Sequence, residues 1–341
     1  MAQCNICRVD RDGSRLYVAY RNGEKVKICN NCKRSMVHCC NDCNKSIVVE
    51  NNSHNFPYGF TCNKCLVNSS FDTDGILDYS FKPIPIFRGG VGSSNVLTMG
   101  MELEMADGNS SEEVDDFAIK ILKYEKLGYS FFYGKYDGSL DEPSVEVVCH
   151  PATLEFHKTT EYWKRMLNEA KNAGLKSNDT DCCGIHIHVN RNYFNNEQVN
   201  KLDALVNRIS RTFRRFARRN CRDYARYSPD KSLSHLGTNS FGRYSCLNIN
   251  QNTIEFRIFK GNMKYESIMA LFELVQGSCD FVKQDSINMD LFFGDRYILK
   301  KTFKEYLESR NFTYLPDYTE MCRVWRDLEP TSEAQPEVVE N

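Results

Sequence analysis

The sequence predicts an α+β protein in which a small cysteine-rich module precedes a larger domain built on a β-sheet. Nine of the sixteen cysteines lie in the first 65 residues, in four Cys-x-x-Cys pairs and one further cysteine. Further along, four stretches alternate polar residues with apolar ones, which is the pattern of half-buried strands. Between these stretches, apolar residues recur at helical spacing, so helices are expected to flank the sheet.

Length and composition set the first limits. A chain of 341 residues is long enough for two or more domains with a sizeable core. Its 26% charged and 41% hydrophobic residues are typical of a soluble globular protein, and a net charge of −1 argues against a surface wholly devoted to nucleic acid. The sequence contains no run of 18 apolar residues and no charged-then-apolar leader. We therefore expect no membrane span, no signal peptide and a location in the reducing cytoplasm.

The N-terminal cysteines are better explained as metal ligands than as disulfides, because the cytoplasm keeps thiols reduced. One Cys-x-x-Cys pair lets two thiolates hold an ion, and two pairs complete the tetrahedral S₄ site typical of structural zinc. The sequence therefore predicts two structural zinc ions. Their expected ligands are Cys4, Cys7, Cys29, Cys32, Cys40, Cys43, Cys62 and Cys65.

The pairing of the four Cys-x-x-Cys segments is open at this point. Sequential pairing leaves 21 and 18 residues between paired segments, enough for a hairpin in each, such as one turning at residues 21–23. An interleaved pairing would instead join the first segment to the third. His38, Cys39 and His54 are spare candidate ligands. Residues 1–65 carry ten Lys and Arg against five Asp and Glu, which suits a nucleic acid or a protein partner. We favour a structural or protein-docking role.

After the cysteines the chain becomes rich in Pro and Gly, between Pro83 and Gly92, which is typical of a linker with an extended entry segment. From Leu328 onward it carries two prolines and five carboxylates, the chain end included, with no aromatic residue, which predicts disorder. We expect a double zinc-ribbon-like module over 1–66, a linker and entry segment over 67–95, a catalytic domain over 96–327 and a disordered acidic tail over 328–341.

The predicted strands carry polar residues on one face only. In Met99–Met105, the period of two puts Glu102 and Glu104 on the same face. The other three strands each do the same. Aligned in one sheet, the four would bring together Glu102, Glu104, Glu146, Glu255, His186, His188 and Arg257. Clustered carboxylates repel unless some are protonated or divalent cations neutralise them, and oxygen ligands with imidazoles suit Mg²⁺ or Mn²⁺.

Helices are predicted around these strands. Ser110 or Ser111 is expected to cap a helix with an acidic first turn. Apolar periodicity predicts further helices over residues 151–174, 196–227 and 263–282. The polar face of the 196–227 helix is almost entirely arginine. That face could be solvated or salt-bridged, or it could contact the phosphates of ATP, RNA or an acidic partner.

The ordered motifs resemble those of the amidoligases in the glutamine-synthetase and glutamate–cysteine ligase superfamily of carboxylate–amine ligases. The resemblance covers about residues 79–283. It implies an α+β fold with an antiparallel glutamine-synthetase-like catalytic sheet flanked by helices. The matching segments are Gly100–Glu104, Asp137–Ser139, Val145–Pro151, Cys183–Val189 and Thr253–Phe259 followed by Gly261.

The resemblance also implies roles for individual residues. Glu102 and Glu104 would each bind one of two metal ions, with His186, Glu255 and Glu146 completing the metal set. The resemblance further implies ATP as a cofactor, with the phosphate-contacting and catalytic roles assigned to His188, Arg257, Asp137 and Arg243. Of these, Arg257 would contact the transferred phosphate, His188 would lie near the nucleotide phosphates, and Arg243 would be a second phosphate or substrate contact.

The implied activity is ATP- and Mg²⁺-dependent formation of an amide or isopeptide bond through an acyl phosphate. The substrates would be an amino-acid, peptide or protein carboxylate and an amine. Three alternatives stay open: a non-catalytic zinc-dependent adaptor that binds nucleic acid or protein, a metal-dependent hydrolase using His186 and His188, and a carboxylate or guanidino kinase. The chain departs from the family pattern at Met99, Met101 and Cys149–His150, which affects packing and substrate choice more than the metal ligands.

Overall fold

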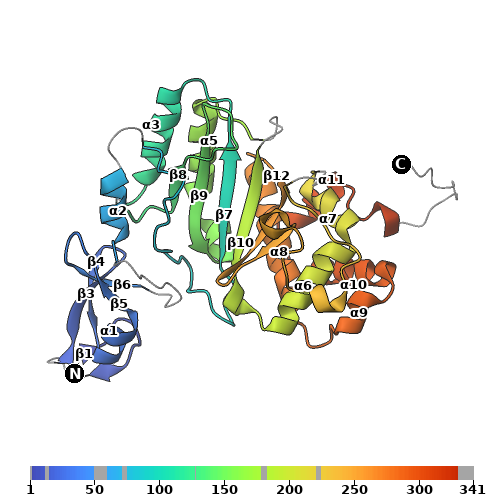
Figure 1. The fold of residues 1–341 in the computed structure, drawn as a ribbon, viewed down its shortest axis with the longest axis horizontal. Coiled ribbons are helices and arrows are strands. Elements are labelled where there is room, and N and C mark those ends of the chain that lie inside the picture. Colours follow the sequence, from blue (N-terminus) through green and yellow to red (C-terminus); the bar gives the residue numbers. More distant parts are fainter. Residues whose placement is uncertain are drawn as a thin grey trace.

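The structure is a computed structural model. It describes residues 2–11, 15–49, 60–70, 75–126, 128–177, 183–219 and 224–328. His54 and the acidic tail beyond Leu328 lie outside the described residues. In Figure 1 the N-terminal module lies at one end, a six-stranded sheet with its helices lies in the middle, and the later helices lie at the other end.

The larger sheet has the strand order β11-β12-β10-β7-β9-β8, and every neighbouring pair is antiparallel. All four predicted strands are therefore adjacent in one sheet, and the prediction of a mixed α+β fold with an antiparallel sheet is confirmed. The strands are Leu247–Ile249 (β11), Thr253–Lys260 (β12), Gly184–Asn190 (β10), Met99–Met105 (β7), Val145–Ala152 (β9) and Phe132–Lys135 (β8).

One face of this sheet is apolar and forms the main core. Met101 and Leu103 of β7 and Ile185 and Ile187 of β10 are at most 1% exposed. Each fully buried side chain of this size stabilises the fold by about 1.5–3 kcal/mol. Helices α3 (Ser111–Leu122), α5 (Tyr162–Asn172) and α8 (Tyr265–Phe281) supply the other side of the same core (Figure 1). The opposite face is left for polar side chains.

Two predicted helices are shorter than expected. Strand β9 continues to Ala152, so the predicted 151–174 helix becomes α4 (Leu154–Thr159) and α5, separated by extended backbone at Thr160. The predicted 196–227 helix is likewise two helices, α6 (Asn196–Arg208) and α7 (Ser210–Ala217), which break at Ile209. Apolar periodicity does not reveal such breaks, because the residues on either side still face the same core.

The remaining helices pack at the β11–β12 side of the sheet. Phe303 of α10 (Arg296–Ser309) contacts Phe213 of α7, Phe281 of α8 and Trp325. Helices α9 (Met289–Phe293) and α11 (Leu315–Met321) complete this layer. In the described part of the chain, every helix is too short or too polar to cross a membrane.

The N-terminal module has its own small sheet with the order β4-β3-β6-β5. The β3–β4 hairpin turns at Asn22 and Gly23, both with positive φ, as the sequence predicts for this turn. The other elements are short. They are β1 (Ala2–Gln3), β2 (Asp10–Arg11), β3 (Tyr17–Arg21), β4 (Glu24–Ile28), α1 (Asn30–Met36), β5 (Val37–Cys39), β6 (Ser46–Val48) and α2 (Asn63–Ser70).

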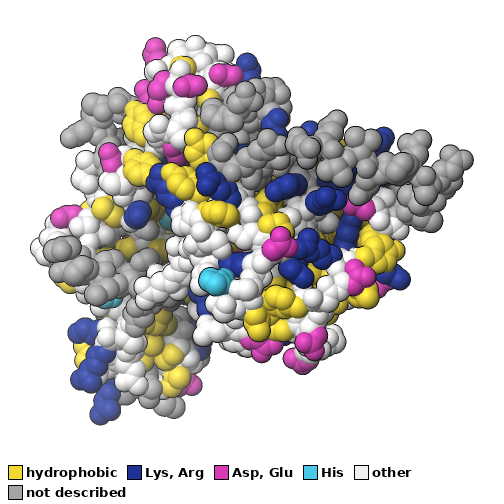
Figure 2. Space-filling model, turned by 45° about the vertical axis from the view of Figure 1, so that its right-hand side comes forward, with side chains coloured by type: hydrophobic (Ala, Val, Ile, Leu, Met, Phe, Trp, Pro, Cys, Tyr) yellow, Lys and Arg dark blue, Asp and Glu magenta, His cyan; other side chains and the backbone are white. Residues whose placement is uncertain are grey.

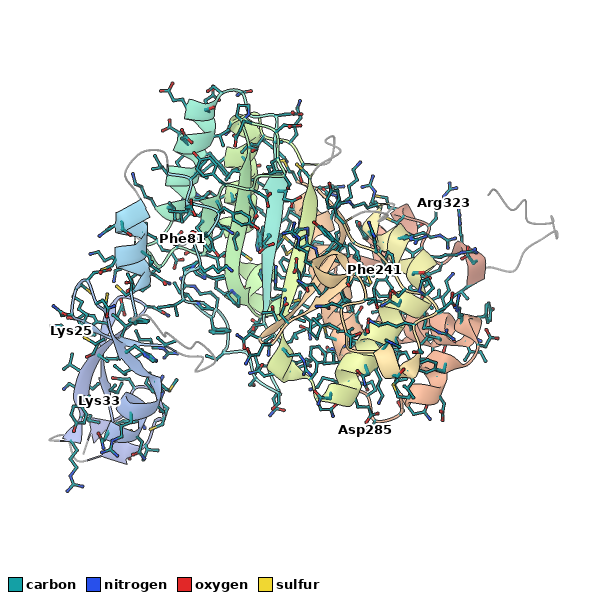
Figure 3. All side chains as sticks on the ribbon, in the orientation of Figure 1. Lys25, Lys33, Phe81, Phe241, Asp285 and Arg323 are labelled. Carbon is teal, nitrogen blue, oxygen red and sulfur yellow. The ribbon has the colours of Figure 1, made fainter. Side chains whose placement is uncertain are left out.

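The module contacts the larger domain through α2 and the segment that follows it. The Asn63 side chain exchanges two hydrogen bonds with the backbone of Ile84. Phe81 packs edge-on against Tyr133 of the large sheet, and Figure 3 shows it between α2 and that sheet. A Cβ at Gly128 would come within 2.7 Å of the Lys64 backbone. The two parts are thus in close backbone contact.

Candidate active site and metal centres

Strand β10 lies at the centre of the polar sheet face. His186 pairs with Glu102 of β7 on one side, and His188 pairs with Glu255 of β12 on the other. Glu104 in turn pairs with Glu146 of β9. Side chains directly opposite in a sheet have Cβ atoms about 5 Å apart. The predicted acidic and imidazole side chains therefore meet on four adjacent strands.

The centre of the cluster is formed by Glu102, His186 and Glu255. Nδ1 of His186 lies 3.2 Å from Oε2 of Glu102 and 3.5 Å from Oε1 of Glu255. One ligand atom from each of the three lies within 4.8 Å of the other two. Burial opposes ionisation of Glu102, but the charges and hydrogen bonds of His188 and His186 together outweigh it and hold the pKa of Glu102 well below its usual value. These three side chains could hold a divalent cation.

Glu104 lies at the edge of the cluster and is tied to the start of β10. Its Oε2 accepts a 2.5 Å hydrogen bond from the backbone N–H of Gly184, and its Oε1 lies 3.9 Å from Nε2 of His186. A Cβ at Gly184 would meet Nη1 of Arg219 at 2.7 Å, so this arginine reaches the same place. Burial raises the pKa of Glu104, although His186 and the Gly184 N–H oppose the shift.

Glu146 lies opposite Glu104, on β9, and has Lys135 and Asp137 as neighbours. Nζ of Lys135 lies 3.8 Å from Oε1 of Glu146. Burial, reinforced by the charge of Glu102, raises the pKa of Glu146 to about 9. Asp137 accepts hydrogen bonds from the N–H and Oγ of Ser139, and these bonds lower its pKa against the effect of burial. The neighbouring Asp137 raises the pKa of Glu146 further, whereas the charge of Lys135 opposes the shift.

Arg257 lies two residues after Glu255 on β12 and reaches the same cluster. The β10–β12 register shifts between Ile185 and Ile187, and the N–H of Arg257 donates to the carbonyl of Cys246, just before β11. The Arg257 guanidinium bonds to Oε1 of Glu255, whose Oε2 accepts a 2.9 Å hydrogen bond from Asn248. Irregularities of this kind are frequent in strands next to active sites.

His188 and Arg243 lie at the border of the cluster. Nε2 of His188 is 3.3 Å from Oε1 of Glu102. Burial would lower the pKa of His188, but Glu102, with smaller effects from Glu255 and Glu146, outweighs burial and raises the pKa to about 9. Arg243 is exposed, and its hydrogen bond to Tyr244 raises its pKa, with a smaller effect from the charge of Asp137. Arg243 thus lies near the candidate site without a contact to the central carboxylates.

Three polar neighbours of the cluster are not predicted by the sequence patterns: Lys135, Asn248 and Arg219. Lys135 could have been found from the sequence, because it lies two residues after Tyr133 and therefore shares a face of β8 with it. Asn248 lies only seven residues before Glu255, on the strand that pairs with it. Nothing local indicates Arg219, because it comes close to Glu104 from a segment distant in sequence. One cavity of about 1140 Å³ is lined by residues from α10 to Leu328 and holds none of the cluster. We give the carboxylate cluster more weight, because it has the donor set for a cation.

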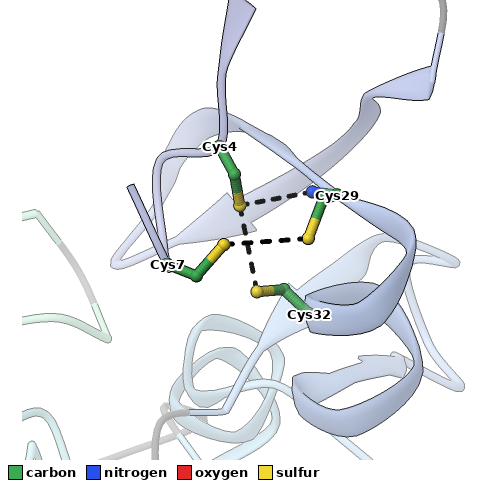
Figure 4. A group of neighbouring side chains, drawn as sticks. All are labelled: Cys4, Cys7, Cys29 and Cys32. Carbon is green, nitrogen blue, oxygen red and sulfur yellow. Dashed lines mark hydrogen bonds between the residues drawn. The ribbon is translucent and has the colours of Figure 1, made fainter. Parts of the chain in front are cut away.

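The first cysteine group is Cys4, Cys7, Cys29 and Cys32. Their sulfur atoms point toward one another, and the Cys4–Cys32 and Cys7–Cys29 Sγ distances are both 3.8 Å (Figure 4). Cys4 and Cys7 flank a turn, whereas Cys29 and Cys32 flank the start of α1. Burial would raise the pKa of Cys4, but backbone N–H groups around it outweigh burial and lower the pKa to about 6.

The second group, Cys40, Cys43, Cys62 and Cys65, repeats the first. The N–H of Cys62 donates to Sγ of Cys40 at 3.3 Å, as the N–H of Cys29 does to Sγ of Cys4. Arg8 and Asn44 occupy equivalent positions after their turns, and both have positive φ. An asparagine follows the first cysteine of all four Cys-x-x-Cys segments. The module is therefore a structural repeat, which the sequence signals through these asparagines.

The geometry of both groups suits zinc. A tetrahedral ion with Zn–S bonds of about 2.3 Å separates its sulfur ligands by about 3.8 Å, which is close to the Sγ distances of 3.8 and 3.9 Å in the two groups. In the structure the first Cys-x-x-Cys segment is joined to the second, and the third is joined to the fourth. This is the sequential pairing, and it rules out the interleaved one. Cys39 and His38 lie outside both groups, so they are not needed as ligands.

Comparisons with known proteins were made by sequence and by structure. No protein-family model matches the chain, and no curated protein matches it by sequence. Among solved structures, the chain is similar to one in the crystal structure of the complex between prokaryotic ubiquitin-like protein Pup and its ligase PafA, with 11% sequence identity and a TM-score of 0.34. The similarity covers 69% of this chain and 63% of the other.

Proposed function

We propose that this protein is an ATP- and Mg²⁺-dependent carboxylate–amine ligase that forms an amide or isopeptide bond. One observation carries the proposal: four adjacent antiparallel strands direct four carboxylates, two imidazoles and a guanidinium to one sheet face. An ordinary solvated sheet face would not concentrate partly or fully buried carboxylates in this way, because burial of unpaired negative charge is costly. The order of the motifs, which resembles that of the amidoligases, supports the same function.

The residues of the cluster fit divalent cations. Two of their buried atoms, Oε1 of Glu146 and Nε2 of His188, have no hydrogen-bond partner among the described residues. Glu102, His186 and Glu255 would hold one Mg²⁺ or Mn²⁺, and Glu104 and Glu146 would supply ligands on the other side of Glu102. Bound there, the cations would neutralise charge on the phosphate oxygens of ATP. These carboxylate and imidazole ligands are sufficient to hold the cations that phosphoryl transfer from ATP requires.

The remaining groups have roles that follow from their charge. Arg257 and His188, on the same face, would stabilise the negative charge of the transferred phosphoryl group, and Arg243 at the border would contact phosphate or substrate. A substrate carboxylate oxygen attacks the γ-phosphorus, and ADP leaves. The amine nitrogen then attacks the carbonyl carbon of the acyl phosphate, inorganic phosphate leaves, and the amine releases a proton. Positioning and charge stabilisation suffice, so no side chain acts as a nucleophile.

We further propose that the N-terminal module binds two structural zinc ions and docks onto the domain that performs the reaction. The support is the S₄ geometry of both cysteine groups together with the close contacts around Asn63 and Gly128. A module fixed in this way is suited to present a macromolecular substrate. Because the module has an excess of Lys and Arg, the binding partners to test are an acidic protein and a nucleic acid.

The function is tested by ADP release. Purified protein is incubated with ATP, Mg²⁺ and a pool of amino acids, peptides and cell lysate, and wild type is compared with Glu104→Gln. Turnover that requires both the pool and Glu104 is expected, and mass spectrometry of the pool identifies the amide product. Glu305→Gln, an exposed carboxylate on α10, is the matched control and should leave turnover unchanged.

Other outcomes separate the alternatives. ADP release that produces a stable phosphorylated product and no amide would indicate a kinase. Product formed without ATP would indicate a hydrolase. If ATP fails to bind even at millimolar concentration, and wild type and Glu104→Gln are equally silent, the ligase proposal is wrong and a zinc-dependent adaptor takes its place.

A further inference from the structure

A cavity of about 430 Å³ at the end of β12 is lined by four cationic side chains and, among the described residues, by no carboxylate. Lys171 comes from the end of α5, Arg218 from the end of α7, Lys260 from the end of β12 and Lys264 from the start of α8. In Figure 1 the ends of β12, α7 and α11 lie close together. Figure 2 shows Lys and Arg side chains gathered across the middle of the larger domain on one face.

Within the described parts of the chain, the four cations have no partner of opposite charge. All four are exposed, and none makes an ion pair with any residue that the structure describes. Lys171 and Arg218 both lie at helix C-termini, where the negative end of the helix dipole favours a positive charge. Their presence there can therefore be explained by helix stability alone. That explanation fails for Lys264, which is the N-cap of α8, where a positive charge is unfavourable. Lys260 lies at the end of a strand and gains nothing from a helix dipole.

The start of α8 strengthens the argument for an anion. The N-cap residue Lys264 makes no side-chain hydrogen bond to the first turn of α8. The backbone N–H groups of that turn therefore receive no hydrogen bond from a capping side chain at this position. Ser267, in the same turn, lines the cavity and is buried. An anion in the cavity would therefore meet lysines, an arginine and the positive end of a 17-residue helix together.

Backbone pairing and hydrogen bonds connect residues that line the cavity to Glu104. Lys260 pairs with Gly184, whose N–H donates to Oε2 of Glu104. The next residue, Gly261, approaches Ser177 so closely that a Cβ would lie 2.2 Å from Oγ of Ser177, and this Oγ donates to the Glu104 carbonyl at 2.7 Å. Because paired residues in a sheet lie about 5 Å apart, the cavity begins within about 10 Å of Glu104.

We infer that this cavity, lined by Lys171, Arg218, Lys260 and Lys264, binds an acidic segment of a polypeptide substrate next to the carboxylate that the protein activates. The inference rests on the proposed function, which already requires a carboxylate substrate at the sheet. A peptide is favoured over nucleic acid because the one aromatic side chain in the described lining, Tyr318, is buried and donates its hydroxyl to the Phe216 carbonyl. It therefore offers no free ring face for stacking on bases.

The test is direct binding, which needs no turnover. Fluorescein-labelled hexaglutamate peptide is titrated with the full chain at low ionic strength, and anisotropy reports binding. Wild type is expected to bind, with affinity falling as salt is added. The double variant Lys260→Glu/Lys264→Glu is expected to bind roughly tenfold more weakly or worse, because two attractions become repulsions. Lys171→Glu, from a different helix, should weaken binding in the same direction.

The matched control is Lys123→Glu, an exposed lysine at the end of α3 that changes net charge in the same sense and lies outside the cavity. It should bind the peptide as wild type does. Circular dichroism melting of every variant verifies the fold. Equal binding by the double variant and wild type, no binding by wild type, or an equal loss with Lys123→Glu would overturn the inference. So would tighter binding of a thymidine oligonucleotide or tripolyphosphate through the same lysines.

Failure of the inference differs from failure of the proposed function. Turnover of an uncharged amino acid without peptide binding would keep the ligase and remove the acidic-peptide site. Peptide binding that depends on Lys260 and Lys264, in a protein without ATP turnover, would keep the site and remove the ligase.

Discussion

His186 lies opposite Glu102 in the β7–β10 pair, and its Nδ1 is 3.2 Å from Oε2 of that glutamate. The two residues are 84 positions apart in the chain. The same nitrogen lies 3.5 Å from Oε1 of Glu255 on the other neighbouring strand. One imidazole thus lies between two carboxylates from two different strands, and a divalent cation could bind between these three side chains.

Divalent metal should stabilise the protein through this cluster. Adding Mg²⁺ or Mn²⁺ to wild type is expected to raise Tm, because a ligand that binds only the folded state at 100 times its Kd adds about 2.7 kcal/mol. In Glu255→Gln the shift should largely disappear, and turnover should fall by roughly 100-fold or more, while the metal-free protein stays folded. Differential scanning fluorimetry measures the shift, and Glu305→Gln should keep it. An undiminished shift in Glu255→Gln would place the metal elsewhere.

Zinc content should follow the two cysteine groups. Protein purified under reducing conditions is expected to contain two zinc ions per chain, since two Cys₄ groups are present. Cys62→Ser should lower the content to about one, because three thiolates hold zinc poorly without the fourth. Mass spectrometry of the metal content measures the number. Cys39→Ser, adjacent to Cys40 but outside both groups, is the matched control and should retain two. Wild-type protein free of zinc would refute both sites.

Acid should destabilise the larger domain through a buried histidine. His157 is completely buried, with Nε2 2.9 Å from the Met99 carbonyl, and burial lowers its pKa to about 4. The unfolded chain takes up a proton at this histidine near pH 6.5, whereas the folded protein does not until about pH 4. Stability from this group is therefore complete above about pH 6.5 and falls as pH drops toward 4, by about 3 kcal/mol at most.

The measurement is Tm against pH between about 7.5 and 4.5, a range that spans most of this titration. His157→Gln should have a lower Tm at the upper end of the range, because packing and hydrogen bonds are lost, but a shallower decline with acid. His235→Gln, at an exposed position, should follow the wild-type slope. If His157→Gln declines as steeply as wild type, other groups cause the acid sensitivity.

Gly261 should resist substitution. A Cβ there would lie 2.2 Å from Oγ and 2.4 Å from the carbonyl oxygen of Ser177. Gly261→Ala is therefore expected to destabilise the protein by about 1–3 kcal/mol, as other overpacking changes do, and to disturb the Ser177 hydrogen bond to the Glu104 carbonyl. Chemical denaturation measures the difference. Gly138→Ala is the control, because a Cβ at Gly138 meets nothing within 4 Å; equal effects of the two substitutions would contradict the prediction.

Much of the candidate site can be predicted from local patterns. The period of two places Glu102 and Glu104 on one face of a strand, and the Cys-x-x-Cys spacing identifies all eight cysteines of the two groups. The two over-long helix predictions have a physical cause, because apolar spacing continues across the breaks at Thr160 and Ile209. The position of Asp137 beside Glu146 follows from neither periodicity nor spacing.

The sequence by itself determined which side chains share a face of each strand and which thiolates are separated by only two residues, because backbone geometry sets those relationships over a few residues. Only the tertiary structure decided that β10 lies between β7 and β12, that Cys4 joins Cys29 rather than Cys40, and that Arg219 and Lys260 reach the neighbourhood of Glu104. These are contacts between distant segments. They depend on the burial of the whole apolar sheet face at once, which no short stretch of sequence encodes.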